Sequence, residues 1–316
     1  MSRFSVSQMA MTGFRVVREN PAAVALWALL QAVGMFAVLG AMVSLIGGPF
    51  ARLQSLSREP GASPDPHLIT ELMTQFVPFL LVILPLSLAF GAVTSAAMNR
   101  IVLRPRDKAF GFLRIGAAEW RQFLLGLQVM LVAAGAYVAV ILAVIVGAVG
   151  IGFASKAAPV AGVLLAVAGG LGLVAAAIYV TVRLSLASAR TFATGRVDLF
   201  GSWDVTRGHF WPILGTYVLA VFLAIVVMSM GSAVVFCIAA VTTGLGPTSD
   251  AMIHPDMATP ASYFTPSQIV YLALNAVVSA LVLPIQATPA AAMYAALTDG
   301  PPPAPVIEGG LYVPKA

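Results

Sequence analysis

Six long apolar runs constrain this chain more than any other feature. They cover residues 21–47, 74–98, 123–153, 158–182, 212–243 and 268–297. A helix that crosses a bilayer needs about 20 apolar residues. The whole chain is 60% hydrophobic and 9% charged, whereas a soluble domain carries about 25% charged residues. We therefore predict an all-α fold, a polytopic transmembrane helical bundle of six spans.

The basic residues are distributed unevenly between the connections. If successive connections alternate between the two sides of a membrane, 14 of the 17 Lys and Arg residues fall on one side, and only Arg52, Arg58 and Lys156 fall on the other. Short cytoplasmic loops are enriched in Lys and Arg. The sequence thus predicts that both termini are cytoplasmic. The net charge of +5 is then a signal of topology and of contact with anionic lipid, not of nucleic-acid binding.

Three amphipathic segments precede the first, third and fifth runs. They cover about 5–19, 107–121 and 198–211, and each places apolar residues on one side of a helix. We expect three interfacial helices. The stretch 179–211 combines the end of the fourth span, such a helix and the re-entry of the chain, and we expect the rest of the chain to be organised around it.

The plan of one interfacial helix and two spans occurs three times. The units are about 5–100, 107–190 and 198–297, which favours a threefold internal repeat. We expect residues 1–300 to form a single membrane domain. Residues 301–316 are rich in Pro and predict a flexible tail. Glycines in the third and fourth spans predict that these two spans pack closely.

Motifs that carry catalysis are missing from the sequence. It has no phosphate-binding glycine loop, no zinc-protease motif and no nucleophile elbow. We expect no buried ionisable group, and Arg183 and Glu71 come nearest to the spans. Asp250, His254 and Asp256 share one loop, but their spacing matches no zinc pattern. The expectation is a protein that is not an enzyme and has no cofactor and no metal site.

Three segments carry a family resemblance. They are VRLSLA at 182–187, DLFGSWDVTRGHFW at 198–211 and DKAFGFLRIGA at 107–117. In these segments the chain resembles bacterial six-span membrane proteins that look like the membrane domain fused to some glycerophosphoryl diester phosphodiesterases. The resemblance implies a bacterial inner-membrane protein of poorly defined role. It implies no catalytic residue here, because the soluble catalytic domain is missing from the sequence.

Two functions follow as hypotheses. The first is a scaffold or lipid-interacting module whose partners are anionic lipids on the cytoplasmic side. Its candidate headgroup ligands are Arg183, Arg190 and Arg207, and its candidate interface anchors are Trp120, Trp203 and Trp211. The alternative is a transporter or channel for a neutral or weakly polar solute, suggested by Gln31, Asn275 and the prolines within the spans. The sequence does not indicate a protein partner.

Overall fold

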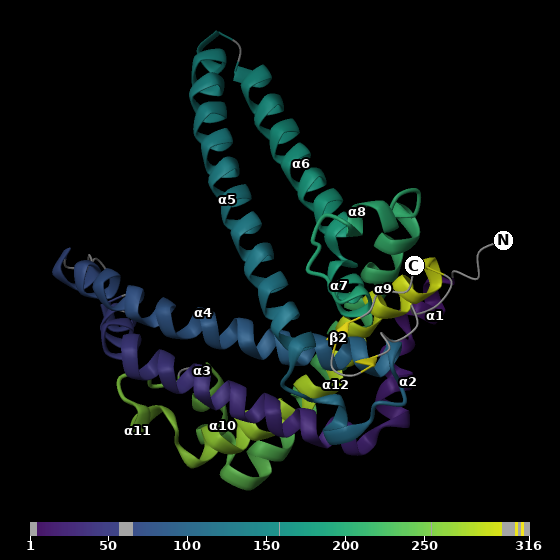
Figure 1. Ribbon diagram of the computed structural model, residues 1–316. Helices are drawn as coiled ribbons and strands as arrows, with labels where there is room; N and C mark the ends of the chain where they lie inside the picture. The colour runs from purple at the N-terminus through teal and green to yellow at the C-terminus, as the bar shows by residue number, and fades with distance from the viewer. Residues whose placement is uncertain are drawn as a thin grey trace.

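Six long helices form most of the protein. The computed structural model describes residues 5–56, 66–157, 159–253, 255–298, 307–308 and 311–312. Within them, six helices are long and apolar enough to cross a membrane (Figure 1). They are α3 (Pro21–Leu56), α4 (Pro66–Leu103), α5 (Ala117–Ala157), α6 (Pro159–Leu184), α9 (Phe210–Thr243) and α12 (Pro266–Leu297). The predicted six-span helical fold is confirmed, and the chain is a multi-pass membrane protein.

Short elements fill the connections between the spans. They are α1 (Val6–Ala10), α2 (Thr12–Glu19), the 3-10 helix η1 (Ala109–Phe112), α7 (Ala187–Thr194), α8 (Ser202–Val205), α10 (Leu245–Ile253) and α11 (Pro260–Tyr263). In the tail, β1 (Ile307–Glu308) pairs antiparallel with β2 (Leu311–Tyr312). The rest of the tail predicted to be flexible lies outside the described residues.

Helix starts follow the local sequence. The Thr265 hydroxyl accepts a hydrogen bond of 3.2 Å from the Gln268 amide, and Pro266 occupies the first turn of α12. This combination of cap and proline favours a helix start. Helix α3 likewise begins at Pro21, but Asn20 does not act as its cap. The Asn20 side chain donates instead to the Val16 carbonyl at 3.1 Å, and so binds the last turn of α2.

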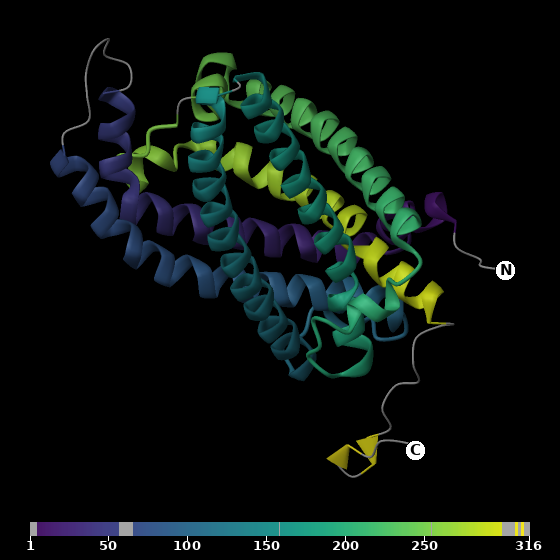
Figure 2. The ribbon, with the colours of Figure 1, turned by 90° about the horizontal axis from the view of Figure 1, so that it is seen from above.

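Helix α12 lies at the centre of the bundle. It packs against α9, α3, α2 and α4, and Figure 2 shows α9 beside it for most of its length. In its most apolar stretch of 18 residues, 44% of the residues are buried, compared with 0% in the corresponding stretches of α5 and α6. The expectation that the chain is organised around the segment 179–211 is therefore wrong. That position belongs to the last span, which the other elements surround.

One glycine lets the first interfacial helix reach this central span. A Cβ on Gly13 of α2 would lie 2.3 Å from the Cα of Ile285 in α12. Backbone atoms cannot move aside as side chains can, so only glycine fits here. Helix α2 is consequently packed against the bundle through Thr12, Gly13 and Val16, while Arg15 and Arg18 remain exposed.

Helices α5 and α6 form a hairpin that extends away from the other four spans (Figure 1). Its large apolar side chains are mostly exposed, among them Val146 (72%) and Leu171 (66%). The expected close glycine packing is wrong for Gly135, Gly147 and Gly169, because a Cβ at each would meet no atom within 4 Å. The hairpin offers apolar surface to lipid along most of its length.

The interfacial segments differ in form from one another. The first is helical over α1 and α2, as predicted. The second and third are shorter than predicted. Of the four residues of η1, Phe110 and Gly111 have non-helical backbone angles; α8 has four residues, and Trp120 lies in the first turn of α5. The reason is tertiary, since hydrogen bonds from distant residues hold both segments in other conformations. These bonds are described below.

Candidate functional site

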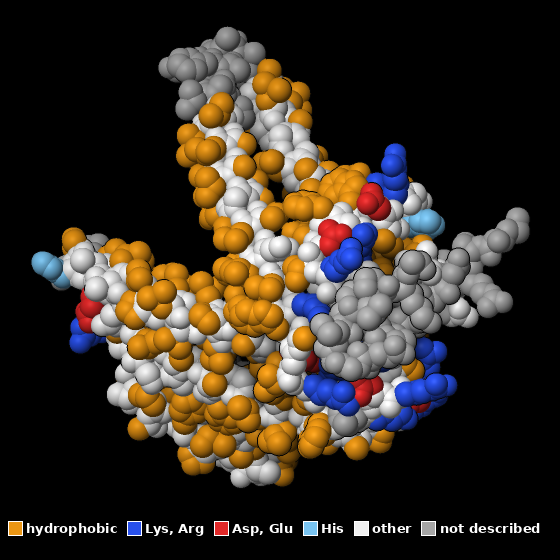
Figure 3. Space-filling view, in the orientation of Figure 1, with side chains coloured by type: hydrophobic (Ala, Val, Ile, Leu, Met, Phe, Trp, Pro, Cys, Tyr) orange, Lys and Arg blue, Asp and Glu red, His pale blue; other side chains and the backbone are white. Residues whose placement is uncertain are grey.

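Basic side chains gather at one end of the molecule (Figure 3). They come from α2, from the connection between α4 and α5, and from the segment between α6 and α9. The opposite end carries Arg52, which pairs with Glu71 at 3.3 Å. The structure therefore brings together the loops that the sequence assigned to one side. We call this the basic end.

Arg190, one of the three predicted headgroup ligands, binds other residues of the protein. Its Nη2 lies 3.1 Å from Oδ2 of Asp198, and its Nη1 donates to the Gly201 carbonyl. The Gly201 amide in turn donates to Asp198 Oδ1 at 2.8 Å. These bonds close the loop 198–201 against α7, and they explain why a long helix does not form over 198–211. Arg190 is a structural residue of this loop.

Arg183 is held by aromatic side chains. Its guanidinium carbon lies 5.1 Å from the ring centroid of Tyr179 and 5.6 Å from that of Trp203. Its Nη2 also donates to the Tyr179 hydroxyl at 3.1 Å. Such cation–π contacts stabilise a positive charge near lipid. Arg183 therefore anchors the end of α6 to α8, which leaves less of its guanidinium for a ligand.

Arg207 and the predicted tryptophan anchors have different surroundings. The Arg207 side chain is exposed. Trp120 and Trp211 are 59% and 75% exposed, as expected of residues at a membrane interface. Trp203, by contrast, is half-buried and packs edge-to-face on Tyr179 at 5.7 Å. The predicted residues thus share one end of the molecule, but they do not converge on one binding cavity.

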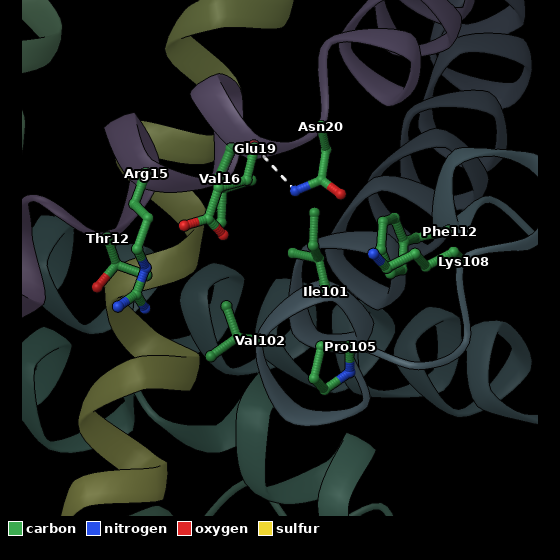
Figure 4. A pocket seen from close by; sticks show the side chains of 10 residues that line it. All are labelled: Thr12, Arg15, Val16, Glu19, Asn20, Ile101, Val102, Pro105, Lys108 and Phe112. Atoms are coloured by element: carbon green, nitrogen blue, oxygen red, sulfur yellow. Dashed lines mark hydrogen bonds between the residues drawn. The ribbon is translucent and has the colours of Figure 1, made fainter.

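A pocket that the sequence did not reveal lies at the same end (Figure 4). Its volume is about 290 Å³, and it separates α2 from the last turn of α4 and the residues after it. The polar lining comes from Arg15, Glu19, Asn20 and Lys108, and the apolar lining includes Val16, Ile101 and Phe112. Arg15 and Lys108 stand on opposite walls, with Glu19 and Asn20 between them (Figure 4).

The charged side chains of this pocket have no partner in the described part of the chain. Among the described residues, those of Arg15, Glu19 and Lys108 form no ion pair and no hydrogen bond. The apolar wall, in contrast, belongs to a buried cluster with Trp27 and Met98. The pocket therefore has a packed floor and a charged rim, an arrangement suited to a ligand with an ionic head and an apolar body.

One wall of the pocket is held in an unfavourable backbone conformation. Phe110, Gly111 and Phe112 have φ values of 50°, 64° and 67°, in the left-handed region. Bulky residues rarely adopt it, and it persists only where the surroundings enforce it. Here the Trp27 indole donates to the Gly111 carbonyl at 2.8 Å, and Arg100 donates to the Phe112 carbonyl. Phe112 is thereby directed inward, whereas Phe110 is 80% exposed.

A buried ion cluster supports this wall. Arg100 and Glu119 are 4% and 5% exposed and pair directly with each other. Arg100 also lies 3.6 Å from Asp107, which pairs with Arg114. The expectation of no buried ionisable group was therefore wrong. It failed because Arg100 and Glu119 each lie near the end of a span, where the sequence pattern suggests contact with water.

A second network joins α4, α5 and α7 without charge. Ser95 and Ser188 lie 2.6 Å apart, the Asn99 amide donates to the Ser188 hydroxyl at 2.8 Å, and the Gln122 amide donates to the Ser188 carbonyl at 2.8 Å. These polar groups are satisfied by one another, as buried groups in lipid must be. Together with the ion cluster, they attach the base of the α5–α6 hairpin to α4.

Several positive charges lie close together at the basic end. Burial, reinforced by the nearby charge of Arg100, lowers the pKa of Arg104. Arg104 also stacks on Phe192, with its guanidinium carbon 5.0 Å from the ring centroid. In the part of the chain that the structure describes, no cluster of His, Cys, Asp and Glu suits a metal ion. His254 and the side chain of Asp250, considered above, lie outside that part.

Comparison with known proteins agrees with the coarse picture. No curated protein and no solved structure matches the chain. One family does match, over residues 4–297, and it is described as a domain of unknown function, DUF7847. The matched region contains all six spans and the pocket. Since this match covers almost the whole sequence, the chain belongs to the DUF7847 family.

Proposed function

We propose that this protein is a non-enzymatic, lipid-interacting membrane protein that holds the phosphate of a phospholipid headgroup in the pocket at its basic end. The observation that carries the proposal is the pair of cations on opposite walls, Arg15 and Lys108, neither of which pairs with another described residue. Two cations across a small cavity suit a phosphate, because each can donate charge-assisted hydrogen bonds to it.

The surroundings of the pocket agree with a lipid ligand. Val16, Ile101 and Phe112 supply apolar contacts below the charged rim. Near the same wall, Phe110 and Ile115 are 80% and 96% exposed. Exposed apolar residues among Lys and Arg are typical of a surface that enters the headgroup layer. A lipid is thus a better match than a wholly polar solute.

The proposal includes a location. Short cytoplasmic loops are enriched in Lys and Arg, so we place the basic end in the cytoplasm and the protein in a bacterial inner membrane. The cytoplasmic leaflet of membranes carries anionic lipids that attract such an end. The resemblance of segments 107–117 and 198–211 to the membrane domain of glycerophosphoryl diester phosphodiesterases is compatible with a role beside phospholipids.

The alternative function, a transporter or channel for a neutral or weakly polar solute, has less support. The alternative depended on polar groups within the spans, and the Asn275 amide donates at 3.2 Å to the Tyr271 carbonyl of its own helix. An amide nitrogen that donates within its own helix has fewer hydrogen bonds left to offer a solute.

Lipid retention tests the proposal. Protein released from nanodiscs of phosphatidylethanolamine and phosphatidylglycerol is analysed by native mass spectrometry. The double variant Arg15→Gln/Lys108→Gln should retain about tenfold less phospholipid. Both side chains are exposed, so losing the ionic contact of each costs about 0.7 kcal/mol, and the two together amount to about tenfold. The matched control is Arg18→Gln/Arg106→Gln, which removes two exposed cations outside the pocket. Equal retention by both double variants would contradict the proposal.

A further inference from the structure

One residue of the pocket does not suit a simple phosphate site. Glu19 lines the same cavity as Arg15 and Lys108, and its carboxylate would repel a phosphate. Arg15 and Glu19 are four residues apart on α2, a spacing that favours an ion pair on a helix. No such pair is formed among the described residues. Glu19 therefore needs another explanation.

The other carboxylates that the structure describes at the basic end either pair with a cation or lie outside the pocket. Asp107 and Glu119 pair with Arg100, and Asp198 pairs with Arg190. Asp204 is exposed on α8, outside the pocket. Glu19 differs from these carboxylates because it lines the cavity and, in the part of the chain that the structure describes, pairs with no cation.

Asn20 adds a second acceptor beside Glu19. Its amide nitrogen donates to the Val16 carbonyl at 3.1 Å, drawn as the dashed line in Figure 4. That bond fixes the orientation of the side chain and leaves its carbonyl oxygen without a partner among the described residues. The carbonyl of an amide accepts hydrogen bonds only. One edge of the pocket therefore offers acceptors, and the walls on either side offer cations.

We propose that the pocket recognises a headgroup carrying both a phosphate and a primary ammonium, as in an amine-bearing phospholipid. This inference rests on the proposed function. The phosphate lies between Arg15 and Lys108, and the ammonium lies against Glu19 and Asn20. A primary ammonium has three N–H donors for these acceptors. A trimethylammonium has none and is recognised by exposed aromatic faces, whereas the one aromatic side chain among the lining residues, Phe112, is only 2% exposed.

The size of the pocket agrees with this headgroup. Ligand pockets commonly range from about 300 to 1,000 Å³, so a volume of about 290 Å³ is small. It suits a headgroup of few atoms rather than an oligosaccharide.

Competition between lipids tests the inference. Delipidated protein is placed in nanodiscs with equal amounts of phosphatidylethanolamine, phosphatidylcholine and phosphatidylglycerol, and the retained lipid is identified by native mass spectrometry. Wild-type protein should retain phosphatidylethanolamine about tenfold over phosphatidylcholine, since only the former donates to Glu19 and Asn20. In Glu19→Gln this preference should fall below about twofold, and retention of phosphatidylglycerol should rise because the repulsion is lost.

Two controls separate the possible failures. Asp204→Asn removes an exposed carboxylate at the same end and should leave the preference unchanged; Glu19→Asp should keep part of it. If wild type shows no preference for the amine, or Glu19→Gln leaves it intact, the inference is wrong while phosphate binding stands. If Arg15→Gln/Lys108→Gln also leaves retention unchanged, the proposed function is wrong. Thermal unfolding of each variant distinguishes lost binding from lost folding.

A further arm identifies the source of the headgroup. Soluble glycerophosphoethanolamine is added to lipid-loaded protein. Displacement at concentrations near those of the lipid would assign the pocket to the free compound. Continued retention of the lipid would assign it to the membrane-bound form. Displacement by glycerophosphocholine at the same concentration would overturn recognition of the amine.

Discussion

The indole Nε1 of Trp27 donates a hydrogen bond of 2.8 Å to the carbonyl oxygen of Gly111, a residue 84 positions away in the chain. Trp27 is completely buried in α3. A buried tryptophan N–H needs an acceptor, and this one fixes the loop that forms a wall of the pocket. The relationship links the first span to the lipid-binding site we propose.

Replacing Trp27 should loosen this wall. Trp27→Phe keeps most of the apolar volume but leaves the Gly111 carbonyl without its donor, at a cost of about 1–3 kcal/mol. We expect a lower thermal unfolding temperature in detergent and weaker lipid retention. Trp211→Phe, at a position 75% exposed, is the control. If the two variants melt alike, the Trp27 bond does not hold the loop.

Gly111→Ala should be destabilising for two reasons. Gly111 has φ of +64°, and an added Cβ would lie 3.0 Å from Leu26 Cδ1 and 3.2 Å from Ala23 Cα. The left-handed conformation alone costs a non-glycine residue about 1–2 kcal/mol. Gly48→Ala in α3 is the comparison, because its Cβ would meet nothing within 4 Å. We expect Gly48→Ala to be neutral or slightly stabilising in a thermal unfolding assay; the reverse order would contradict the loop geometry.

Glu119→Gln should reveal the buried ion pair. Removing Glu119 leaves the buried Arg100 with only Asp107, at 3.6 Å. Because loss of a partner from a buried pair costs about 3–5 kcal/mol, we expect a loss near the lower end of that range. Glu71→Gln breaks the pair with Arg52, whose side chains are 39% and 69% exposed, so its cost should stay below about 1 kcal/mol. Unfolding by a denaturing detergent measures both. Similar losses would mean that water reaches Arg100.

Arg190 and Arg207 should behave differently. Arg190→Gln breaks the bonds to Asp198 and Gly201, and we expect a loss of about 1–2 kcal/mol because the site is partly exposed. Arg207→Gln, at an exposed position, should unfold like the wild type. Thermal unfolding of the two single variants is the measurement. Equal unfolding temperatures would show that the loop 198–201 does not depend on Arg190.

Topology is tested by reporters. If the basic end is cytoplasmic, a fusion after Ala316 should report a cytoplasmic location, and so should an insertion near Lys108, because short cytoplasmic loops are enriched in Lys and Arg. An insertion near Arg58 should report the opposite side. A periplasmic signal from the C-terminal fusion would reverse the proposed orientation.

The parts of the fold that the sequence predicted are those that depend on local properties. Burial of apolar runs in lipid needs no partner, so six spans were recognisable from 21–47 to 268–297. The amphipathic segment 5–19 is also helical as predicted, over α1 and α2, and its apolar stripe packs on α12 and α9. The segments 107–121 and 198–211 had similar patterns but formed only short helices. Trp27, Arg100 and Arg190 bind their backbones from a distance, and helical periodicity cannot report such bonds.

The same distinction between local sequence and tertiary contacts applies to the candidate site. By itself the sequence determined that basic residues gather at one end, because loop positions between spans alternate. Only the tertiary structure decided which of them are free. Arg183 and Arg190 are engaged by Tyr179 and Asp198, while Arg15 and Lys108, far apart in sequence, face one cavity. Ion pairing depends on distances of a few ångströms between segments, and those distances are set when α2 packs against α12 and the loop closes on α3.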